Sequence, residues 1–382
     1  MSGGSTMLEK NVLKVEAPGD GCYPIHIESG SLDTVAVFCS RHAPAHRYCV
    51  IADSQVAQLY GERVLEAFRR EDINVELISF PAGEWNKSCE AWSSLSNKLI
   101  SAGFGRDSAI VALGGGVTGD LAGFVAATYM RGVPVVQVPT SLLAMLDSSV
   151  GGKTGIDTEA GKNLIGAFHH PAGVLVDPVV LKTLPRDQRC AGLAEAIKTA
   201  AILDEDLWDW MGVHAHELVK GGTDASAQLV ARVVSHKAHI VAEDPAEQNL
   251  RSILNFGHTV GHALEALEGY KLLHGEAVAA GMRIEASMGE SLGITKLGTT
   301  KQIEALLEQC LLGGLWEVDR RSAEVREAML LDKKSLKNRV RCVFLSQIGT
   351  VATDTEGHYT FPLDREELDD LLSTALTANP KD

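Results

Sequence analysis

The sequence predicts two domains of different class, an α/β domain with a mostly parallel sheet followed by a helical domain. Short runs rich in Val and Ile alternate with helical runs in the first half. A glycine cluster directly follows one of these strand-like runs. From about Pro185 onward, apolar residues recur with the period of an α-helix. These observations place the domain boundary after Leu184, which gives domains of residues 1–184 and 185–382.

The first half of the chain carries the strand predictions. Alternation with helical runs such as Val56–Glu71 and Ala91–Ala102 predicts a parallel sheet covered on both faces. Five short apolar runs are expected to be its strands: Tyr48–Ala52, Asn74–Phe80, Ser108–Leu113, Val133–Val138 and Val174–Asp177.

The second half is predicted to be helical, with one late β-like patch at Val340–Phe344, Val351 and Ala352. Five runs have helical periodicity: Ala191–Met211, Ala225–Ala242, Leu250–Leu267, His274–Leu292 and Thr299–Leu312.

Composition excludes several classes of protein. Hydrophobic residues make up 45% of the 382 residues, which excludes a mainly disordered chain. The net charge of −15 lacks the basic footprint of a nucleic-acid binder, and no apolar run reaches the roughly 18 residues of a membrane helix. The seven cysteines contain no CxxC pair, and the N-terminus resembles neither a secretory signal nor a transit peptide. We therefore expect a cytoplasmic protein without nucleic-acid or membrane partners.

Two glycine-rich segments are candidates for binding phosphate. Gly114–Asp120 follows a predicted strand, and glycines there let backbone amides approach a ligand, although a tight turn explains them equally well. Asp147–Gly155 places an acid, two hydroxyls and Lys153 around a glycine hinge, and Lys162 and Asn163 follow. Together these side chains are suited to a small cationic pocket for a phosphate, and a solvated loop is the alternative.

The predicted helix Leu250–Leu267 carries a polar stripe. Arg251, Asn255, His258 and His262 fall within an arc of roughly 60° on an otherwise apolar helix. Two histidines four residues apart can bind one metal ion, and His274 with Glu195 would complete a nitrogen and oxygen ligand set. Glu195 and Lys198 share a helical face within an apolar run, where a surface ion pair is the default interpretation. The residues alone thus predict a phosphate- and metal-binding protein without defining a reaction.

The chain resembles the 3-dehydroquinate synthase family within the sugar phosphate cyclases. Matching segments occur in family order from about residue 50 to 335. They are GGGVTGDLAGFVAATYMRG (114–132), QVPTSLLAMLDSSVGGKTGIDT (137–158), GKNLIGAFHHP (161–171), GLAEAIKTA (192–200), LRSILNFGHTVGHALE (250–265), HGEAVAAGM (274–282) and LDKK (331–334).

The resemblance implies a Rossmann-like α/β domain that binds NAD, an all-α C-terminal domain that binds Zn²⁺ or Co²⁺, and an active site in the cleft between them. The implied metal ligands are Glu195, His258 and His274, so that His262 contacts substrate instead. The remaining implied substrate and catalytic residues are Arg131 (reaching a neighbouring subunit's site in a homodimer), Asp147, Lys153, Asn163, Lys198, Lys237, Arg251, Asn255 and one of Lys333 and Lys334. The implied NAD contacts are Asp53, Glu84, Lys87, Gly115, Gly116, Val117, Asp120, Thr140, Ser141, Lys162, Thr183 and Leu184.

The implied activity is that of a phosphate-eliminating carbon–oxygen lyase of the shikimate pathway, which supplies aromatic amino acid biosynthesis. It converts 3-deoxy-D-arabino-heptulosonate 7-phosphate to 3-dehydroquinate and phosphate. NAD first oxidises the substrate transiently, and phosphate is then eliminated. The reduced cofactor returns its hydride, an intramolecular aldol step closes the ring, and NAD is thereby regenerated.

Three other functions remain as alternatives. The chain departs from the family pattern at Ser141, at His169-His170 and at Arg186-Asp187-Gln188. These departures keep open a sister cyclase acting on sedoheptulose 7-phosphate, although Arg251, Asn255 and His262 argue against it. A metal-dependent polyol dehydrogenase would not need the phosphate-holding lysines, and a non-catalytic binding protein would not need the complete set of site residues.

Overall fold

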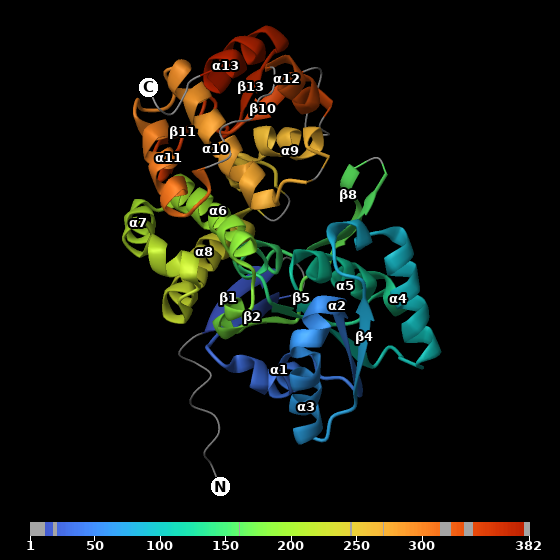
Figure 1. Ribbon diagram of the computed structural model, residues 1–382. Coiled ribbons are helices and arrows are strands. Elements are labelled where there is room, and N and C mark those ends of the chain that lie inside the picture. The colour runs from blue at the N-terminus through green and yellow to red at the C-terminus, as the bar shows by residue number, and fades with distance from the viewer. Residues whose placement is uncertain are drawn as a thin grey trace. The chain divides into compact units, whose positions relative to one another are not determined.

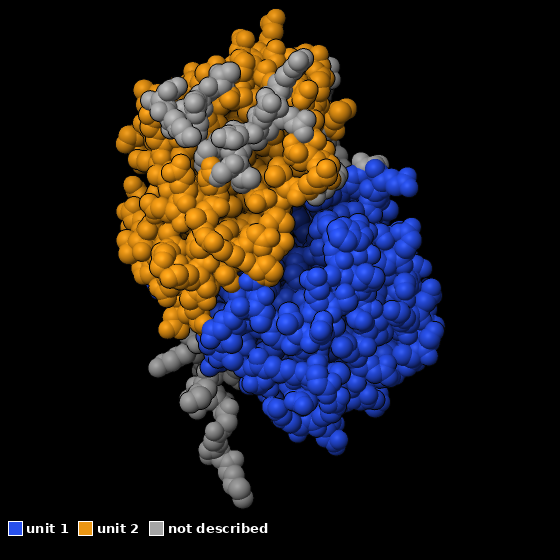
Figure 2. Space-filling view, in the orientation of Figure 1, with its two compact units in different colours: residues 1–184, 226–242 blue, residues 185–225, 243–382 orange. Residues whose placement is uncertain are grey.

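The computed structural model describes residues 12–17, 21–159, 161–244, 247–269, 271–313, 322–331 and 339–377. The chain divides into two compact units (Figures 1 and 2). The first comprises residues 1–184 and 226–242, and the second comprises residues 185–225 and 243–382. Within the described part of the chain, no helix combines the length and hydropathy that crossing a membrane requires.

The first unit is built on a seven-stranded sheet in the order β1-β2-β9-β6-β5-β3-β4. All neighbouring strands run parallel except β1 and β2, which are antiparallel. The strands are β1 Val12–Ala17, β2 Gly21–Ile27, β3 Arg47–Asp53, β4 Val75–Phe80, β5 Ser108–Gly114, β6 Val135–Pro139 and β9 Gly173–Val176. The five predicted strands are thus confirmed as β3, β4, β5, β6 and β9, and β1 and β2 were not predicted.

Helices connect the strands and bury the sheet. β5 is buried along its whole length, as expected of a central parallel strand. One core cluster joins side chains of β3, β4 and β5 to those of α4 and α5, among them Ile51, Leu99 and Leu121. The helices of this unit are α1 Val35–His42, α2 Ser54–Val56, the π-helix η2 Ala57–Gly61, α3 Glu62–Arg70, α4 Cys89–Ser101 and α5 Gly116–Thr128. Short helical turns complete it: η1 Ser31–Thr34, η3 Glu84–Asn86, η4 Tyr129–Arg131, η5 Ala144–Ser148 and η6 Pro178–Lys182.

Two further elements belong to this unit. A two-stranded antiparallel hairpin, β7 Lys153–Thr158 and β8 Gly161–Phe168, forms a sheet of its own (Figure 1). Residues 226–242 of the helix α8, Thr223–Glu243, also group with this unit, although they lie well beyond the boundary expected after Leu184.

The second unit is mainly helical and contains short strand pairs. Its helices are α6 Arg186–Leu203, α7 Glu205–Lys220, η7 Leu250–Asn255, α9 His258–Leu267, α10 His274–Ser291, α11 Thr299–Gln309, α12 Ser322–Leu331 and α13 Arg365–Thr377. The pairs are β10 Val340–Cys342 with β13 Phe361–Leu363, and β11 Leu345–Gln347 with β12 Thr350–Val351. A core cluster that includes Leu264, Ile284 and Phe344 packs α9, α10, α12 and α13 together.

Two predicted single helices are in fact broken. The run Ala191–Met211 is interrupted at Asp204, whose side chain caps α7 by accepting from the backbone N–H of Leu207 at 2.8 Å. The run Leu250–Leu267 is interrupted at Gly257, which has a φ of +77°. A side chain at Gly257 would meet the backbone of α10, so the break allows α9 and α10 to pack closely. The prediction of one continuous polar stripe was therefore wrong, because Arg251 and Asn255 lie on η7 while His258 and His262 lie on α9.

Candidate active site

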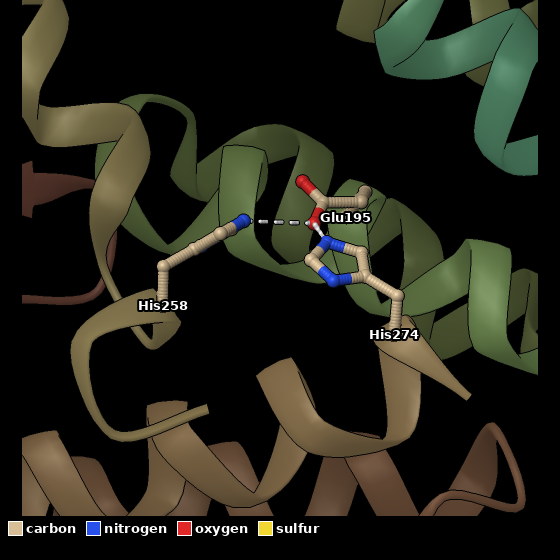
Figure 3. Close-up of side chains that lie close together, drawn as sticks. All are labelled: Glu195, His258 and His274. Carbon is tan, nitrogen blue, oxygen red and sulfur yellow. Dashed lines mark ion pairs between the residues drawn. The ribbon is translucent and has the colours of Figure 1, made fainter. Parts of the chain in front are cut away.

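Three side chains of the second unit converge on one point. Nε2 of His258 and Nε2 of His274 each lie 3.4 Å from Oε1 of Glu195, as Figure 3 shows. Ligand atoms of the three residues all lie within 4.8 Å of one another. Glu195 is 1% exposed, and its Oε1 atom makes no hydrogen bond within the described part of the chain. A buried carboxylate oxygen that faces two imidazole nitrogens fits a divalent cation such as Zn²⁺.

Glycines bring the three helices that carry these residues close together. A Cβ on Gly275, next to His274, would lie 1.8 Å from the carbonyl oxygen of Ala191 on α6. A Cβ on Gly281 would lie 1.9 Å from the carbonyl oxygen of Gly257. Side chains at these positions would force the helices apart. Close backbone packing therefore sets the separation of Glu195, His258 and His274.

Glu285 fixes the start of α9, where His258 is the first residue. Its carboxylate is 0% exposed and accepts from the backbone N–H of Gly257 at 2.8 Å and of Val260 at 3.2 Å. Both donors are among the groups that a helix start leaves without an intrahelical partner. The cap therefore holds His258 in place.

Two further contacts involve carboxylates of this cluster or next to it. Lys198 Nζ lies 2.5 Å from Oε2 of Glu195, and both side chains are buried. This is an internal ion pair and not the surface pair that the sequence favoured by default. Glu265, 3% exposed, places Oε2 3.3 Å from Nδ1 of His274. Sequence analysis missed Glu265, although its spacing of seven residues from His258 and three from His262 places all three on one side of α9.

The charges within the cluster shift the pKa values in opposite directions. Burial acts to raise the pKa of Glu195, but the Lys198 ammonium and the His258 imidazole outweigh burial and hold it well below its usual range. Burial and Lys198 lower the pKa of His258 to about 4. Burial also acts to lower the pKa of His274, but the carboxylates of Glu195 and Glu265 outweigh burial and raise it to about 10. At neutral pH, His258 is therefore neutral and ready to bind a metal, whereas His274 carries a proton.

Several other residues of the second unit, which are predicted to bind substrate, are close to His258 in the sequence. The His262 ring stands edge-on to His258, with centroids 5.3 Å apart, and lies 6.0 Å from the His274 ring. Arg251 is buried, and its backbone N–H donates to Asp244 at 3.0 Å. Asn255 Nδ2 donates to Glu247 Oε1 at 3.0 Å. Lys333 and Lys334 lie outside the described residues.

In the first unit, the predicted cofactor residues gather where the strand order reverses. β4 and β5 lie on opposite sides of β3, so the carboxyl ends of β3 and β5 form a switch point, where α/β sheets commonly bind ligands. Asp53 ends β3 and accepts from Thr118 Oγ1 at 3.3 Å. Gly115 and Gly116 begin α5, and Cβ atoms there would lie 3.3 Å from the hydroxyls of Ser141 and Ser148. The glycines therefore keep the first turn of α5 open to a ligand phosphate.

Ion pairs join other residues of this unit that are predicted to contact NAD. Lys87 Nζ lies 2.5 Å from Oδ2 of Asp120, and Lys162 Nζ lies 3.6 Å from Oε1 of Glu84. At the end of η6, Thr183 Oγ1 lies 2.5 Å from the Tyr60 hydroxyl. The backbone N–H of Thr140 donates to Gly114, while Val117 and Leu184 lie at the start of α5 and after η6.

The predicted substrate residues of the first unit lie on several elements. Lys237 lies on the part of α8 that groups with this unit, and its Nζ is 2.6 Å from Oδ1 of Asp147. Lys153 begins β7 and is exposed. Asn163 lies on β8 with a φ of +53°, and Arg131 is exposed with a φ of +69°.

Comparisons with known proteins identify the family of the chain. The 3-dehydroquinate synthase N-terminal family model matches residues 77–191, and the C-terminal model matches residues 192–335. A 3-dehydroquinate synthase of Symbiobacterium thermophilum is 46% identical over 293 residues, which is 76% of this chain and 82% of the relative.

Solved structures of related cyclases have the same fold. A 2-deoxy-scyllo-inosose synthase complexed with carbaglucose-6-phosphate, NAD⁺ and Co²⁺ matches with a TM-score of 0.87 and 25% identity, over 95% of this chain and 99% of that one. A 2-epi-5-epi-valiolone synthase of Streptomyces hygroscopicus with bound NAD⁺ and Zn²⁺ matches with a TM-score of 0.84 and 25% identity, over 96% and 100%.

Proposed function

The chain belongs to the 3-dehydroquinate synthase family, and on that premise we propose that Glu195, His258 and His274 hold the metal ion of its active site. The protein is a 3-dehydroquinate synthase, a lyase of the shikimate pathway. It converts 3-deoxy-D-arabino-heptulosonate 7-phosphate to 3-dehydroquinate and phosphate, using NAD and a divalent metal ion. The observation that carries the site assignment is the convergence of two imidazole nitrogens on the buried Oε1 of Glu195.

When bound, NAD and the metal ion would supply the chemistry that protein side chains lack: NAD would accept and return a hydride, and a cation such as Zn²⁺ or Co²⁺ would act as a Lewis acid. The side chains orient and charge the site. Lys198 neutralises Oε2 of Glu195 at 2.5 Å and leaves Oε1 to face the histidines. Glu265 accepts from Nδ1 of His274, which directs Nε2 toward Glu195.

We assign the substrate's carboxylate and hydroxyl groups to the polar side chains that the family resemblance implies. Arg251 is the cation that would pair bidentately with a carboxylate. Asn255 and His262 would bind hydroxyls, and Asp147 with Lys237 forms a charged pair suited to holding or moving a proton at a substrate oxygen.

The phosphate group of the substrate is assigned to cations and amide donors. Lys153 and Asn163 lie at the start of β7 and on β8, the two strands of one hairpin. Donors fixed before the reaction stabilise a departing phosphate without the cost of reorganisation. The substrate phosphate can itself accept the proton during elimination, so that the protein chiefly positions it.

We assign NAD to the switch point of the sheet in the first unit. Its pyrophosphate would lie at the first turn of α5, where Gly115 and Gly116 expose backbone N–H groups. Asp53, at the end of β3, would accept hydrogen bonds from a ribose, as acids at such positions do. The Gly116→Val variant tests this assignment by calorimetry or isotope exchange. A branched side chain at position 116 would block the approach of the NAD pyrophosphate to the first turn of α5 and so weaken NAD binding.

A homodimer is part of the proposal. Arg131, expected to reach a neighbouring subunit's site, is exposed, and so are the apolar side chains of Leu164, Ile165 and Phe168 on β8. A second copy would cover such side chains, which are otherwise costly to expose together. Light scattering that gives twice the chain's mass of 40.8 kDa supports this state, and a monomer with full activity would contradict it.

We propose a cytoplasmic location from the cysteines. All seven are free and five of them are buried, as expected in a reducing compartment. Recovery of the active protein with seven titratable thiols from the cytosolic fraction is the expected outcome, and recovery from an extracellular fraction would contradict it.

Substrate identity is tested by direct competition. Equal concentrations of 3-deoxy-D-arabino-heptulosonate 7-phosphate and sedoheptulose 7-phosphate are offered to the protein with NAD and Zn²⁺. We expect dehydroquinate as the product, because Arg251 requires a carboxylate that sedoheptulose 7-phosphate lacks. A valiolone-type product in place of dehydroquinate would assign the chain to a sister activity.

A further inference from the structure

Lys87 connects two groups of residues that the family resemblance assigns to different ligands. Its side chain is almost fully buried, and its ammonium donates to Asp120 Oδ2 at 2.5 Å and to Asn163 Oδ1 at 2.6 Å. Asp120 belongs to the expected NAD contacts, whereas Asn163 belongs to the expected phosphate contacts. One buried cation therefore bridges the cofactor side and the substrate side of the first unit.

The charge of Lys87 is stable. Burial acts to lower its pKa, but the carboxylates of Asp120 and Glu84 outweigh burial and raise the pKa above its usual value. Lys87 therefore remains an ammonium at neutral pH, a group that donates hydrogen bonds and never accepts them.

This contact fixes the orientation of the Asn163 amide. An asparagine side chain has an accepting oxygen and a donating NH₂ group, and the two can exchange places by a flip. Because Lys87 can only donate, it selects the orientation in which Oδ1 faces the ammonium. The NH₂ group then points away from Lys87, and it is the group that a phosphate oxygen requires.

The backbone of Asn163 is tied to Lys87 as well. The N–H of Asp157 donates to the carbonyl oxygen of Lys87 at 2.7 Å, and Oδ1 of Asp157 accepts from the N–H of Asn163 at 2.8 Å. Asn163 also has a φ of +53°, in the left-handed region that asparagine tolerates better than most residues. Lys87 thus holds the position of Asn163 through Asp157 and its amide orientation through the direct contact.

We propose that Lys87 is a positioning residue for the substrate phosphate, acting by presenting the NH₂ group of Asn163 to it. The same ammonium also contacts Asp120, which belongs to the expected NAD contacts. The inference rests on the proposed function, because that assigns phosphate to Asn163. It predicts that a change at Lys87 weakens phosphate binding even when NAD saturates the protein.

Binding of inorganic phosphate to the NAD- and Zn²⁺-loaded protein tests the proposal without turnover. Phosphate Kd is measured by ³¹P line broadening for the wild type, Lys87→Met, Asn163→Ala and the double variant, at saturating NAD. We expect each single change to raise Kd about tenfold, as loss of a hydrogen bond to a charged group does. The double variant should bind no more weakly than Asn163→Ala alone, because both changes remove the same contact. The proposal would be overturned if the effects of the two single changes on phosphate Kd multiply in the double variant. It would also be overturned if Lys87→Met alters only the affinity for NAD.

Asn163→Asp separates the phosphate role from a structural one. A carboxylate at this position keeps the partner of Lys87 but removes the NH₂ donors, so the fold should survive while phosphate Kd rises at least tenfold. Retained phosphate affinity in Asn163→Asp would overturn the proposal. Lys87→Arg keeps a donor and should recover part of the affinity, while Lys98→Met, a surface change on α4, should leave it unchanged.

The experiments distinguish a failure of the proposed function from a failure of the role proposed for Lys87. If the protein forms no dehydroquinate but the variants show the expected non-additive phosphate binding, the substrate assignment fails and the role of Lys87 stands. If the wild type binds NAD but no phosphate, the role of Lys87 is overturned whatever the turnover assay shows.

Discussion

Nδ1 of His274 lies 3.3 Å from Oε2 of Glu265, a carboxylate buried to 3% exposure. The carboxylate accepts a hydrogen bond from Nδ1–H and so orients the ring. Nε2 is thereby left to face Glu195. A carboxylate behind a metal-binding histidine both orients the ring and raises its basicity. Glu265 is therefore placed to orient His274, one of the three proposed ligands.

Glu265→Gln should weaken metal binding about 10- to 100-fold, because the amide is a poorer acceptor for the imidazole N–H. Zn²⁺ affinity, measured by competition with a chromophoric chelator, reports this directly. Glu308→Gln, the same change at an exposed position on α11, is the matched control and should have no effect. An unchanged Zn²⁺ affinity in Glu265→Gln would show that the carboxylate does not support His274.

Metal binding should release about one proton at mildly acidic pH. His274, with its pKa raised to about 10, must lose a proton before it can bind, whereas His258, with its pKa lowered to about 4, has none to lose. The affinity for Zn²⁺ should therefore rise about tenfold per pH unit between about pH 5.5 and 7, below the range in which zinc-bound water ionises. Calorimetry in buffers of different ionisation enthalpy counts the protons. Release of no proton would contradict the assigned protonation of His274.

Gly257→Ala should destabilise the protein by about 2–4 kcal/mol, through left-handed strain and overpacking against α10. The added Cβ would lie 2.5 Å from Cγ of Met282 and 2.9 Å from two backbone atoms of α10. Since His258 follows directly, Zn²⁺ affinity should fall as well.

Gly293→Ala is the matched control for this change. Gly293 has a φ of +69° but nothing within 4 Å of its Cβ position, so the substitution should cost only about 1 kcal/mol of strain. Chemical denaturation measures both variants. Equal destabilisation of the two would show that packing against α10 does not require glycine at position 257.

Lys153→Ala should raise KM for the phosphorylated substrate far more than it weakens NAD binding. Lys153 lies at the exposed start of β7, so its loss should leave the fold intact and remove a point charge from the phosphate site. Steady-state kinetics and NAD titration separate the two effects. Unchanged substrate kinetics would remove Lys153 from the site.

Much of the first unit could be predicted from the sequence, since strands such as Ser108–Gly114 are buried on both faces and read as continuous apolar runs. The hairpin β7–β8 could not, because its residues are partly exposed and carry the glycines and charges of the phosphate segment. The grouping of residues 226–242 with this unit could not be predicted either, because contacts such as that between Lys237 and Asp147 join residues 90 positions apart in the sequence.

Periodicity alone placed the polar residues of the second unit on one helix. It joined His258 and His262 to Arg251 and Asn255 on one helix, because apolar spacing continues across the break at Gly257. The resemblance grouped His258 and His274 with Glu195, and their ligand atoms lie within 4.8 Å of one another, while their role as metal ligands stays a prediction. Neither periodicity nor the resemblance identified Glu265, although its spacing places it on the same side of α9 as His258 and His262, because its partner His274 lies on another helix.

The most direct test of the account follows phosphate, dehydroquinate and NADH together during turnover of 3-deoxy-D-arabino-heptulosonate 7-phosphate. We predict equal amounts of phosphate and dehydroquinate from substoichiometric NAD, with no net NADH. Activity should be lost on chelation, restored by Zn²⁺ in the wild type, and not restored in a folded His274→Ala variant. Net accumulation of NADH, or full activity in His274→Ala, would contradict the account.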